Sequence, residues 1–173
     1  MQQAEVGQRG MSADVPMALD LARSTGWTCG AAGSVPAVGE VLFSSRERPA
    51  VMAALMDWLD DARAVHGFTR IVAEAPMVTG DFRGRDAALM AIEMHGFVSY
   101  WCWENAIPFR QEHVGTVRKA VLGRGNFARG TAKLAVISWC EREGIPIGGH
   151  DAADAALLWA YATGYRRQRE MAA

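Results

Sequence analysis

Cysteine is scarce in this sequence: Cys29, Cys102 and Cys140 lie far apart, without a CxxC motif or a Cys/His ligand spacing. This pattern excludes a disulfide framework and a structural zinc site, and it favours a reducing, cytoplasmic setting. Long apolar runs are missing as well, because no window approaches the length needed to span a bilayer and no targeting pattern is evident. The sequence therefore predicts a cytoplasmic protein without membrane association.

An excess of charge of one sign is also lacking, since the 173 residues carry a formal net charge of -1 at pH 7. DNA would have to be bound by a local basic segment and not by overall charge. With 50% hydrophobic and 21% charged residues, the chain fits one compact domain with a buried core. Residues 1–14 are polar and aperiodic, so we expect a disordered tail followed by a single domain over 15–173.

Apolar periodicity predicts an α/β protein. The predicted strands begin at Pro16, resume after a turn over 23–26, and then cover 37–43, 69–75 and 107–113. The predicted helices run from Pro49 to the stop at Gly67 and over 86–105, 131–143 and 152–165, with helical turns and a glycine-rich loop over 114–130. The expected architecture is a five-stranded mixed sheet, a three-stranded antiparallel meander plus two parallel strands, flanked by helices.

Two acids lie at strand ends. Asp20 is in an apolar strand, and Ala18 and Ala22 on the same face leave space above it. Glu74 closes the strand of the crossover at the carboxyl edge of the sheet, where open α/β sheets bind ligands. The alternatives are a turn-capping aspartate and a surface glutamate.

Two more acids, Asp151 and Asp154, begin the last helix three residues apart, which places them near one face. An imitation of a capping box is the alternative for this pair. Together with the strand acids, however, they can converge at one sheet edge. Clustered carboxylates repel one another, and a divalent cation relieves the repulsion. Hard oxygen ligands without cysteine favour magnesium or manganese.

Four signatures follow one another between about residue 16 and residue 165. They are the stretch from Asp20 to Trp27, then Glu74, the stretch 117–125 (VRKAVLGRG), and 151–155 (DAADA). In this order they resemble the signatures of RuvC-type Holliday junction resolvases, which belong to the ribonuclease H-like superfamily.

The resemblance implies a ribonuclease H-like fold, a homodimer, and two-metal hydrolysis of phosphodiesters in four-way or otherwise branched DNA. It matches Asp20, Glu74, Asp151 and Asp154 to four catalytic, metal-binding acids, which would hold two Mg²⁺ ions that Mn²⁺ can replace. His150 lies beside them as a further candidate. The loop over 123–130 is longer than in the bacterial form, the spacings between the acids differ, and Met77 stands where an aromatic residue is expected. These departures point to a divergent branch, such as the viral or phage resolvases, and leave junction specificity open.

A basic run lies between two acids in the sequence, Glu112 and Glu141. Its members are Arg118, Lys119, Arg124, Arg129 and Lys133. Such a run is usually a solvated face, but the resemblance places it beside the metal site, where interleaved glycines fit a phosphate-contacting loop. Lys119 would also help to neutralise charge at the scissile phosphate.

Phe82 and Phe127 lie in predicted loops, where each could stack on an unpaired DNA base or pack beneath its own loop. The helix over 86–105 is apolar on more than one face, which is typical of a central helix or of one that a partner covers. With the resemblance behind it, we take this helix as the homodimer interface, where Gly96 would permit close approach.

Two other functions remain open. One is a ribonuclease H-like nuclease that acts on RNA, hybrids or flaps with the same acids. The other is a non-catalytic DNA-binding protein of the same fold. The sequence does not determine the cleavage preference or a helicase partner.

Overall fold

A computed structural model of the chain describes residues 13–76, 85–128 and 130–165. Its strands are β1 (Pro16–Asp20), β2 (Ser24–Cys29), β3 (Ala37–Leu42), β4 (Arg70–Glu74) and β5 (Phe109–Glu112). Its helices are α1 (Arg48–His66), α2 (Arg85–Glu104), α3 (Val114–Leu122), α4 (Thr131–Glu143) and α5 (His150–Thr163). Each strand and helix expected from the sequence is present.

The five strands form one mixed sheet in the order β3-β2-β1-β4-β5. β1, β2 and β3 pair antiparallel as a meander, whereas β4 pairs parallel with both β1 and β5. This confirms the predicted α/β class and topology. Because β1 and β4 are parallel neighbours, their carboxyl ends lie at the same edge of the sheet.

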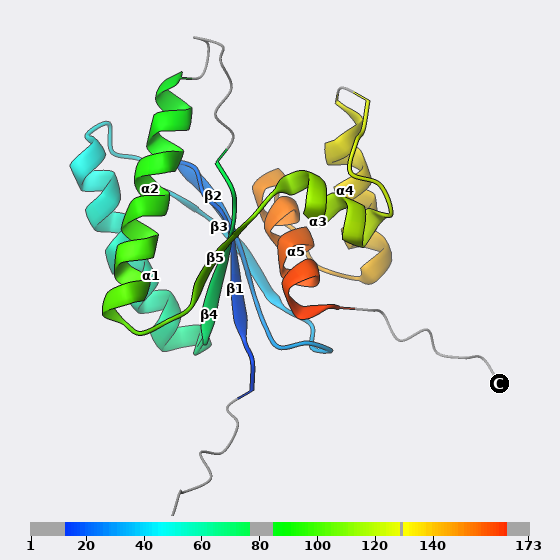
Figure 1. Cartoon of the computed structure of the whole chain (residues 1–173), viewed down its shortest axis with the longest axis horizontal. Helices are drawn as coiled ribbons and strands as arrows, with labels where there is room; N and C mark the ends of the chain where they lie inside the picture. The colour runs from blue at the N-terminus through cyan, green and yellow to red at the C-terminus, as the bar shows by residue number, and fades with distance from the viewer. Residues whose placement is uncertain (1–12, 77–84, 129, 166–173) are drawn as a thin grey trace, which may run out of the picture.

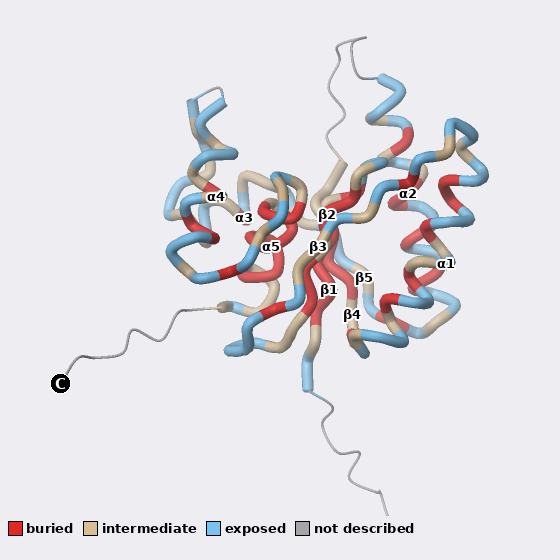
Figure 2. Tube along the Cα trace, turned by 180° about the vertical axis from the view of Figure 1, so that it is seen from behind, coloured by how far each residue is buried: buried red, intermediate tan, exposed pale blue. Residues whose placement is uncertain are grey.

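The helices form two layers, with α1 and α2 on one face of the sheet and α3, α4 and α5 on the other (Figure 1). Successive side chains of β1 point to opposite faces of the sheet, so this strand contributes to both layers. Met17 and Leu19 belong to the cluster under α1 and α2, while Ala18 belongs to the cluster under α5. Burial follows the same division, because the helices are buried where they face the sheet and exposed on their outer sides (Figure 2).

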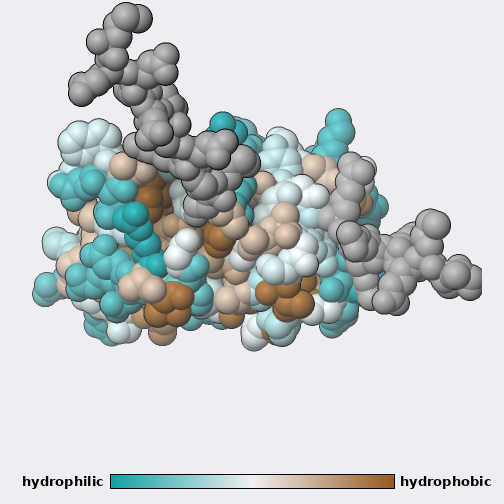
Figure 3. Space-filling model, turned by 90° about the horizontal axis from the view of Figure 1, so that it is seen from below, coloured by the Kyte–Doolittle hydropathy of each residue, from teal (hydrophilic) through white to brown (hydrophobic). Residues whose placement is uncertain are grey.

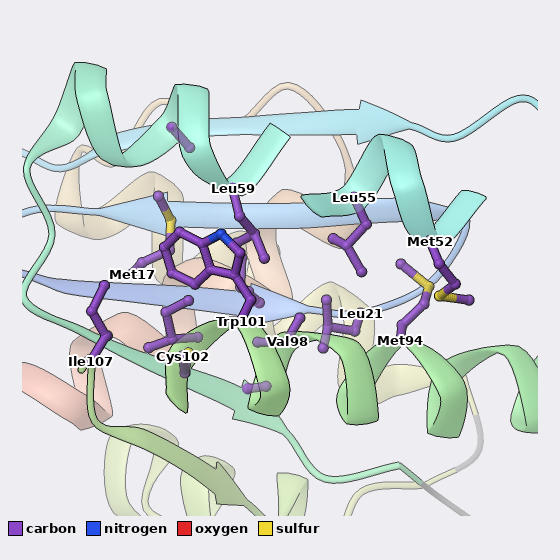
Figure 4. Packing of buried hydrophobic residues seen from close by; sticks show 14 of the residues in the cluster. Met17, Leu21, Met52, Leu55, Leu59, Met94, Val98, Trp101, Cys102 and Ile107 are labelled. Carbon is purple, nitrogen blue, oxygen red and sulfur yellow. The ribbon is translucent and has the colours of Figure 1, made fainter. Parts of the chain in front are cut away.

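Bulky side chains fill the layer between the sheet and the pair α1 and α2. Leu55 and Leu59 of α1 and Val98 and Trp101 of α2 meet above the strands (Figure 4). The indole of Trp101 donates a hydrogen bond of 2.9 Å to Asp60 Oδ1 at the rim of this layer.

In the opposite layer, small side chains are concentrated on the first half of α5, while larger ones such as Leu157 and Trp159 follow later in the helix. The sheet-facing residues of α5 include the fully buried alanines Ala152, Ala155 and Ala156. The indole of Trp159 donates a hydrogen bond of 2.7 Å to the Gly30 carbonyl oxygen and ties α5 to the end of β2. A helix that packs through alanine lies close to the strands, so short side chains from both can meet.

The turn predicted over 23–26 is shorter than expected, because β2 already begins at Ser24. Gly26 lies inside the strand and pairs with Asp20 on one side and Glu40 on the other. A Cβ at Gly26 would lie 2.0 Å from the Asp151 carbonyl oxygen. The glycine therefore serves a close approach of α5 and not a turn.

The apolar residues of α2 divide into two sets. Met90, Met94, Val98 and Trp101 are buried in the core. Five others are exposed: Leu89, Ile92, Phe97, Tyr100 and Trp103. Only the exposed set, with Gly96 open on its outer side, is available to a partner.

All three cysteines are buried. Burial raises the pKa of Cys29 to about 11 and the pKa values of Cys102 and Cys140 to about 12. None of the described helices is both long and apolar enough to cross a membrane.

At the end of the molecule where β1 begins, hydrophilic and hydrophobic residues are interspersed (Figure 3).

The expected tail over 1–14 lies largely outside the described residues. Asp14 is described, and its carboxylate forms an ion pair of 2.8 Å with the Arg70 guanidinium. This contact lowers the pKa of Asp14. Arg70 also donates to the Ala162 carbonyl oxygen of α5 at 2.8 Å, so this contact joins the start of the domain to its last helix.

Candidate metal centre

The four predicted acids come from three elements that meet at one edge of the sheet. Asp20 is the last residue of β1 and Glu74 the last residue of β4. Asp151 and Asp154 lie in the first turns of α5, which packs across β1 and β2. The structure thus brings together residues separated by more than a hundred positions in the sequence.

Capping does not account for the pair on α5. The helix begins at His150, and its N-cap is Gly149, which makes no side-chain capping hydrogen bond. The cap is supplied from elsewhere, since the Ala152 amide donates a hydrogen bond of 3.1 Å to Glu40 Oε1 on β3. Asp151 and Asp154 are therefore not occupied as a capping box.

The acids interact electrostatically within a desolvated site. Burial, followed by the charges of Glu74, Asp154 and Asp151, raises the pKa of Asp20 to about 7. Burial and the charge of Asp154 raise the pKa of Glu74 to about 7. Burial also raises the pKa of Asp154, against the opposing effect of Arg118. Such mutual repulsion is expected where several carboxylates share one site.

Two cations lie near the acids. Arg118 Nη2 on α3 is 3.7 Å from Asp154 Oδ1, and the Arg118 side chain is only 20% exposed. Its Nε is buried and has no hydrogen-bond partner among the described residues. Lys133 on α4 is exposed, and its charge lowers the pKa values of Asp20 and Asp154. These two residues offset only part of the negative charge of four acids.

The donor set fits a divalent cation by its chemistry. Carboxylate oxygens are the ligands that Mg²⁺ and Mn²⁺ prefer. Desolvated carboxylates that raise one another's pKa gain most from a bound positive charge. Within residues 13–76, 85–128 and 130–165, no three Asp, Glu, His or Cys side chains already surround a single point at ligand distances. The fit to a cation therefore rests on the chemistry of the donors and not on a preformed coordination sphere.

Three supporting residues were not among the predicted site residues. Gly26 admits the backbone of α5 beside Asp20, and Glu40 holds the first turn of that helix. His95 of α2 is buried, with Nε2 at 2.8 Å from the Glu74 carbonyl oxygen and Nδ1 at 2.7 Å from that of Ala91. Gly26 lay within the quoted signature, but nothing in the sequence pairs Glu40 or His95 with the site.

The remaining predicted residues are spread around this edge. Lys119 and Arg124 line a hollow of about 450 Å³ beside the glycines of the loop after α3. The Arg124 guanidinium lies over the half-buried Phe127 ring, 4.4 Å from its centroid. His150 is exposed at the start of α5. Met77, Phe82 and Arg129 lie outside the described residues.

The sheet order, the two helical layers and the acids at the carboxyl edge define a ribonuclease H-like fold. Solved RuvC structures share it. RuvC from T. thermophilus in complex with a Holliday junction substrate has a TM-score of 0.64 and 16% identity, over 87% of this chain and 96% of that one. A second T. thermophilus RuvC structure has a TM-score of 0.61 and 16% identity over the same shares.

The yeast mitochondrial Holliday junction resolvase Ydc2 has a TM-score of 0.50 and 12% identity, over 84% of this chain and 75% of that one. At the level of sequence, no protein-family model matches the chain and no curated protein is similar to it. The chain therefore has the fold of the RuvC-type resolvase structures, at a sequence identity of only 12–16%.

Proposed function

We propose that the protein is a metal-dependent endonuclease that resolves four-way or other branched DNA junctions. The observation that carries the proposal is the convergence of Asp20, Glu74 and Asp154 in a desolvated site at the carboxyl edge of a RuvC-type sheet. Two of the solved structures with this fold are T. thermophilus RuvC with a Holliday junction substrate and a yeast Holliday junction resolvase.

Asp20, Glu74, Asp151 and Asp154 would hold two Mg²⁺ ions, and Asp20 is the central acid of the set, because the charges of the other three all raise its pKa. When bound, such ions supply an activated water and stabilise charge on the phosphate and the leaving oxygen. Arg118 and Lys133 attract the phosphodiester to this edge. Hydrolysis would leave a 5′ phosphate and a 3′ hydroxyl.

The exposed basic residues around the acids would hold the DNA arms. Lys119 and Arg124 line one hollow together with three glycines, whose lack of side chains leaves room for a sugar–phosphate backbone. Phe127 supports the Arg124 guanidinium in the structure, which favours packing over base stacking for this ring. Arg129 and Phe82 stay predictions.

The exposed set on α2 would form a homodimer interface. Trp103 is 77% exposed and Tyr100 51% exposed, and large apolar groups on one helix face mark interaction surfaces. A two-fold axis there would present two acid clusters to one junction. Trp103→Ser should then shift the protein toward monomers in light scattering, whereas Leu134→Ser, which removes a 64% exposed leucine from α4, should not. Equal masses for both variants would contradict this interface.

The decisive experiment incubates the pure protein and Mg²⁺ with four-way junction, flap, duplex, RNA–DNA hybrid and single-stranded substrates in parallel. A resolvase should cut the junction fastest and place paired nicks at symmetry-related positions of two strands. Faster cutting of hybrids or flaps would reassign the substrate within the same chemistry. Binding without cutting in either Mg²⁺ or Mn²⁺ would leave a non-catalytic DNA-binding protein.

A further inference from the structure

A second hollow opens beside the acid cluster, on the side away from α3 and α4. It has a volume of about 510 Å³ and lies between the β1–β2 turn, the β3–α1 loop and the start of α2. Asp151 belongs to its wall, so this hollow is continuous with the candidate metal centre. None of its other residues was predicted to contact DNA.

Three arginines line this hollow: Arg23, Arg46 and Arg48. The Arg48 guanidinium is already paired, with Glu93 at 2.6 Å and Asp86 at 3.6 Å. Arg23 is exposed and donates one hydrogen bond of 2.5 Å to the Ser45 carbonyl oxygen, which fixes the side chain without neutralising it. Arg46 is exposed and forms no hydrogen bond or ion pair with the other described residues. Two guanidinium groups that form no ion pair among the described residues thus line one hollow.

The helices around the hollow add to its attraction for anions. Arg48 begins α1, and Asp86 and Ala87 belong to the first turn of α2, so two helix N-termini meet there. The amide groups at a helix N-terminus carry a partial positive charge. Asp86 is 98% exposed and is held by Arg48, so its charge is partly offset.

We propose that this hollow is a second phosphate-binding site, in which Arg23 and Arg46 hold the sugar–phosphate backbone of a DNA strand that passes the acid cluster. The inference rests on the proposed function and adds a specific path to it. The strand would run from the basic residues of α3 and α4, across Asp20 and Asp154, to the β3–α1 loop. Cations would then grip the DNA on both sides of the cut and not only on one.

The test measures junction affinity by fluorescence anisotropy in Ca²⁺ over a series of salt concentrations, with the full-length protein. Arg46→Ala and Arg23→Ala should each bind several-fold more weakly and each reduce the salt slope by about 0.9, which corresponds to one lost phosphate contact. Arg110→Ala is the matched control, because Arg110 is an exposed arginine on β5 outside the hollow. It should leave the slope unchanged.

Arg46→Ala is the decisive variant, because the Arg46 side chain forms no hydrogen bond or ion pair within the described part of the chain, so its loss should not loosen the loop. If wild-type protein cuts the junction while Arg46→Ala binds and cuts it with unchanged salt dependence, the second site is wrong and the nuclease stands. If wild-type protein neither binds nor cuts DNA, the proposed function itself fails. Arg46→Lys should recover most of the slope, since the slope reports the number of phosphates neutralised by a positive charge, which lysine also carries.

Discussion

The two helical layers pack on the same sheet by opposite means. The layer of α1 and α2 uses leucine, methionine and tryptophan, whereas the first half of α5, which carries the acids, packs through alanine and beside Gly26. Bulky side chains keep a helix away from the strands, and small ones let it approach. The carboxylates of Asp20 and Asp154 meet because they lie on the closely packed face. The candidate metal centre therefore lies beside the part of the core where the buried side chains are smallest.

The largest expected effect is on the rate of cleavage, and it is tested by substituting one acid on each face of the sheet. Asp20→Asn should lower the junction cleavage rate by roughly 10³-fold, or about 4 kcal/mol, because it removes a central oxygen ligand. Its affinity for the junction in Ca²⁺ should change little. Asp60→Asn alters the acid that accepts the Trp101 hydrogen bond on the other face, and it should cut at nearly the wild-type rate. Quenched-flow measurement of nicking compares the two, and persistent cutting by Asp20→Asn would remove Asp20 from the site.

The free energy of unfolding should depend on pH, and the raised pKa values of the buried acids determine the direction of this dependence. The pKa of Asp20 is about 7 in the folded chain and lower when unfolded, so the folded state binds the extra proton. Stability should therefore rise as the pH falls from 8 through 7 toward 5. The free energy of unfolding of Asp20→Asn should exceed that of the wild type by about 2–4 kcal/mol at pH 8 and differ little from it at pH 5. Urea titrations without metal measure this, and a variant no more stable at pH 8 would contradict the burial of this charge.

The same wild-type chain should gain stability from Mg²⁺ at pH 8, because an ion that binds only the folded state shifts the unfolding equilibrium. Asp20→Asn should gain much less. Equal shifts in melting temperature for both proteins would place the ion elsewhere.

Two glycines on opposite faces offer a matched pair. A Cβ at Gly26 would meet the backbone of Asp151, whereas one at Gly39 would lie 2.7 Å from the ring of Trp27. Each alanine substitution should cost roughly 1–3 kcal/mol of unfolding free energy through overpacking. Only Gly26→Ala should also slow cleavage at saturating substrate, since only that change displaces α5 and its acids. Similar cleavage rates for two equally destabilised variants would mean that the close approach of α5 is structural alone.

The smallest expected effect on cleavage concerns a residue of the α1 and α2 layer that contacts one of the four acids. His95 belongs to α2, yet it contacts the Glu74 carbonyl oxygen. His95→Phe should slow cleavage by about 10- to 100-fold, the usual consequence of losing a residue that orients a ligand. Val98→Ala provides a control in the same helix, because it opens the core without touching Glu74. If both variants lose activity only in proportion to stability, His95 does not position the acid.

The strands and helices could be predicted because the apolar period of each segment agrees with its place in the fold. The four acids could be proposed because a charged residue interrupts an apolar pattern, as at Asp20. The residues that hold these acids in place could not be predicted. Glu40 contacts Ala152 and His95 contacts Glu74 across long separations in the sequence, which a local sequence pattern does not reveal. The prediction of a turn over 23–26 was wrong for a related reason. A glycine that admits a neighbouring helix cannot be told from a turn glycine by sequence alone.

The buried cysteines bear on how the protein can be studied in solution. Their thiols have pKa values of about 11 to 12, so almost no thiolate forms at neutral pH and alkylating reagents react slowly with them. A cysteine introduced at exposed Trp103 or Arg46 would therefore accept a maleimide spin label or fluorophore selectively in the otherwise native chain. Distances between labels on two subunits of the proposed dimer, or between a label and an arm of the proposed DNA substrate, could then be measured without removal of the native cysteines.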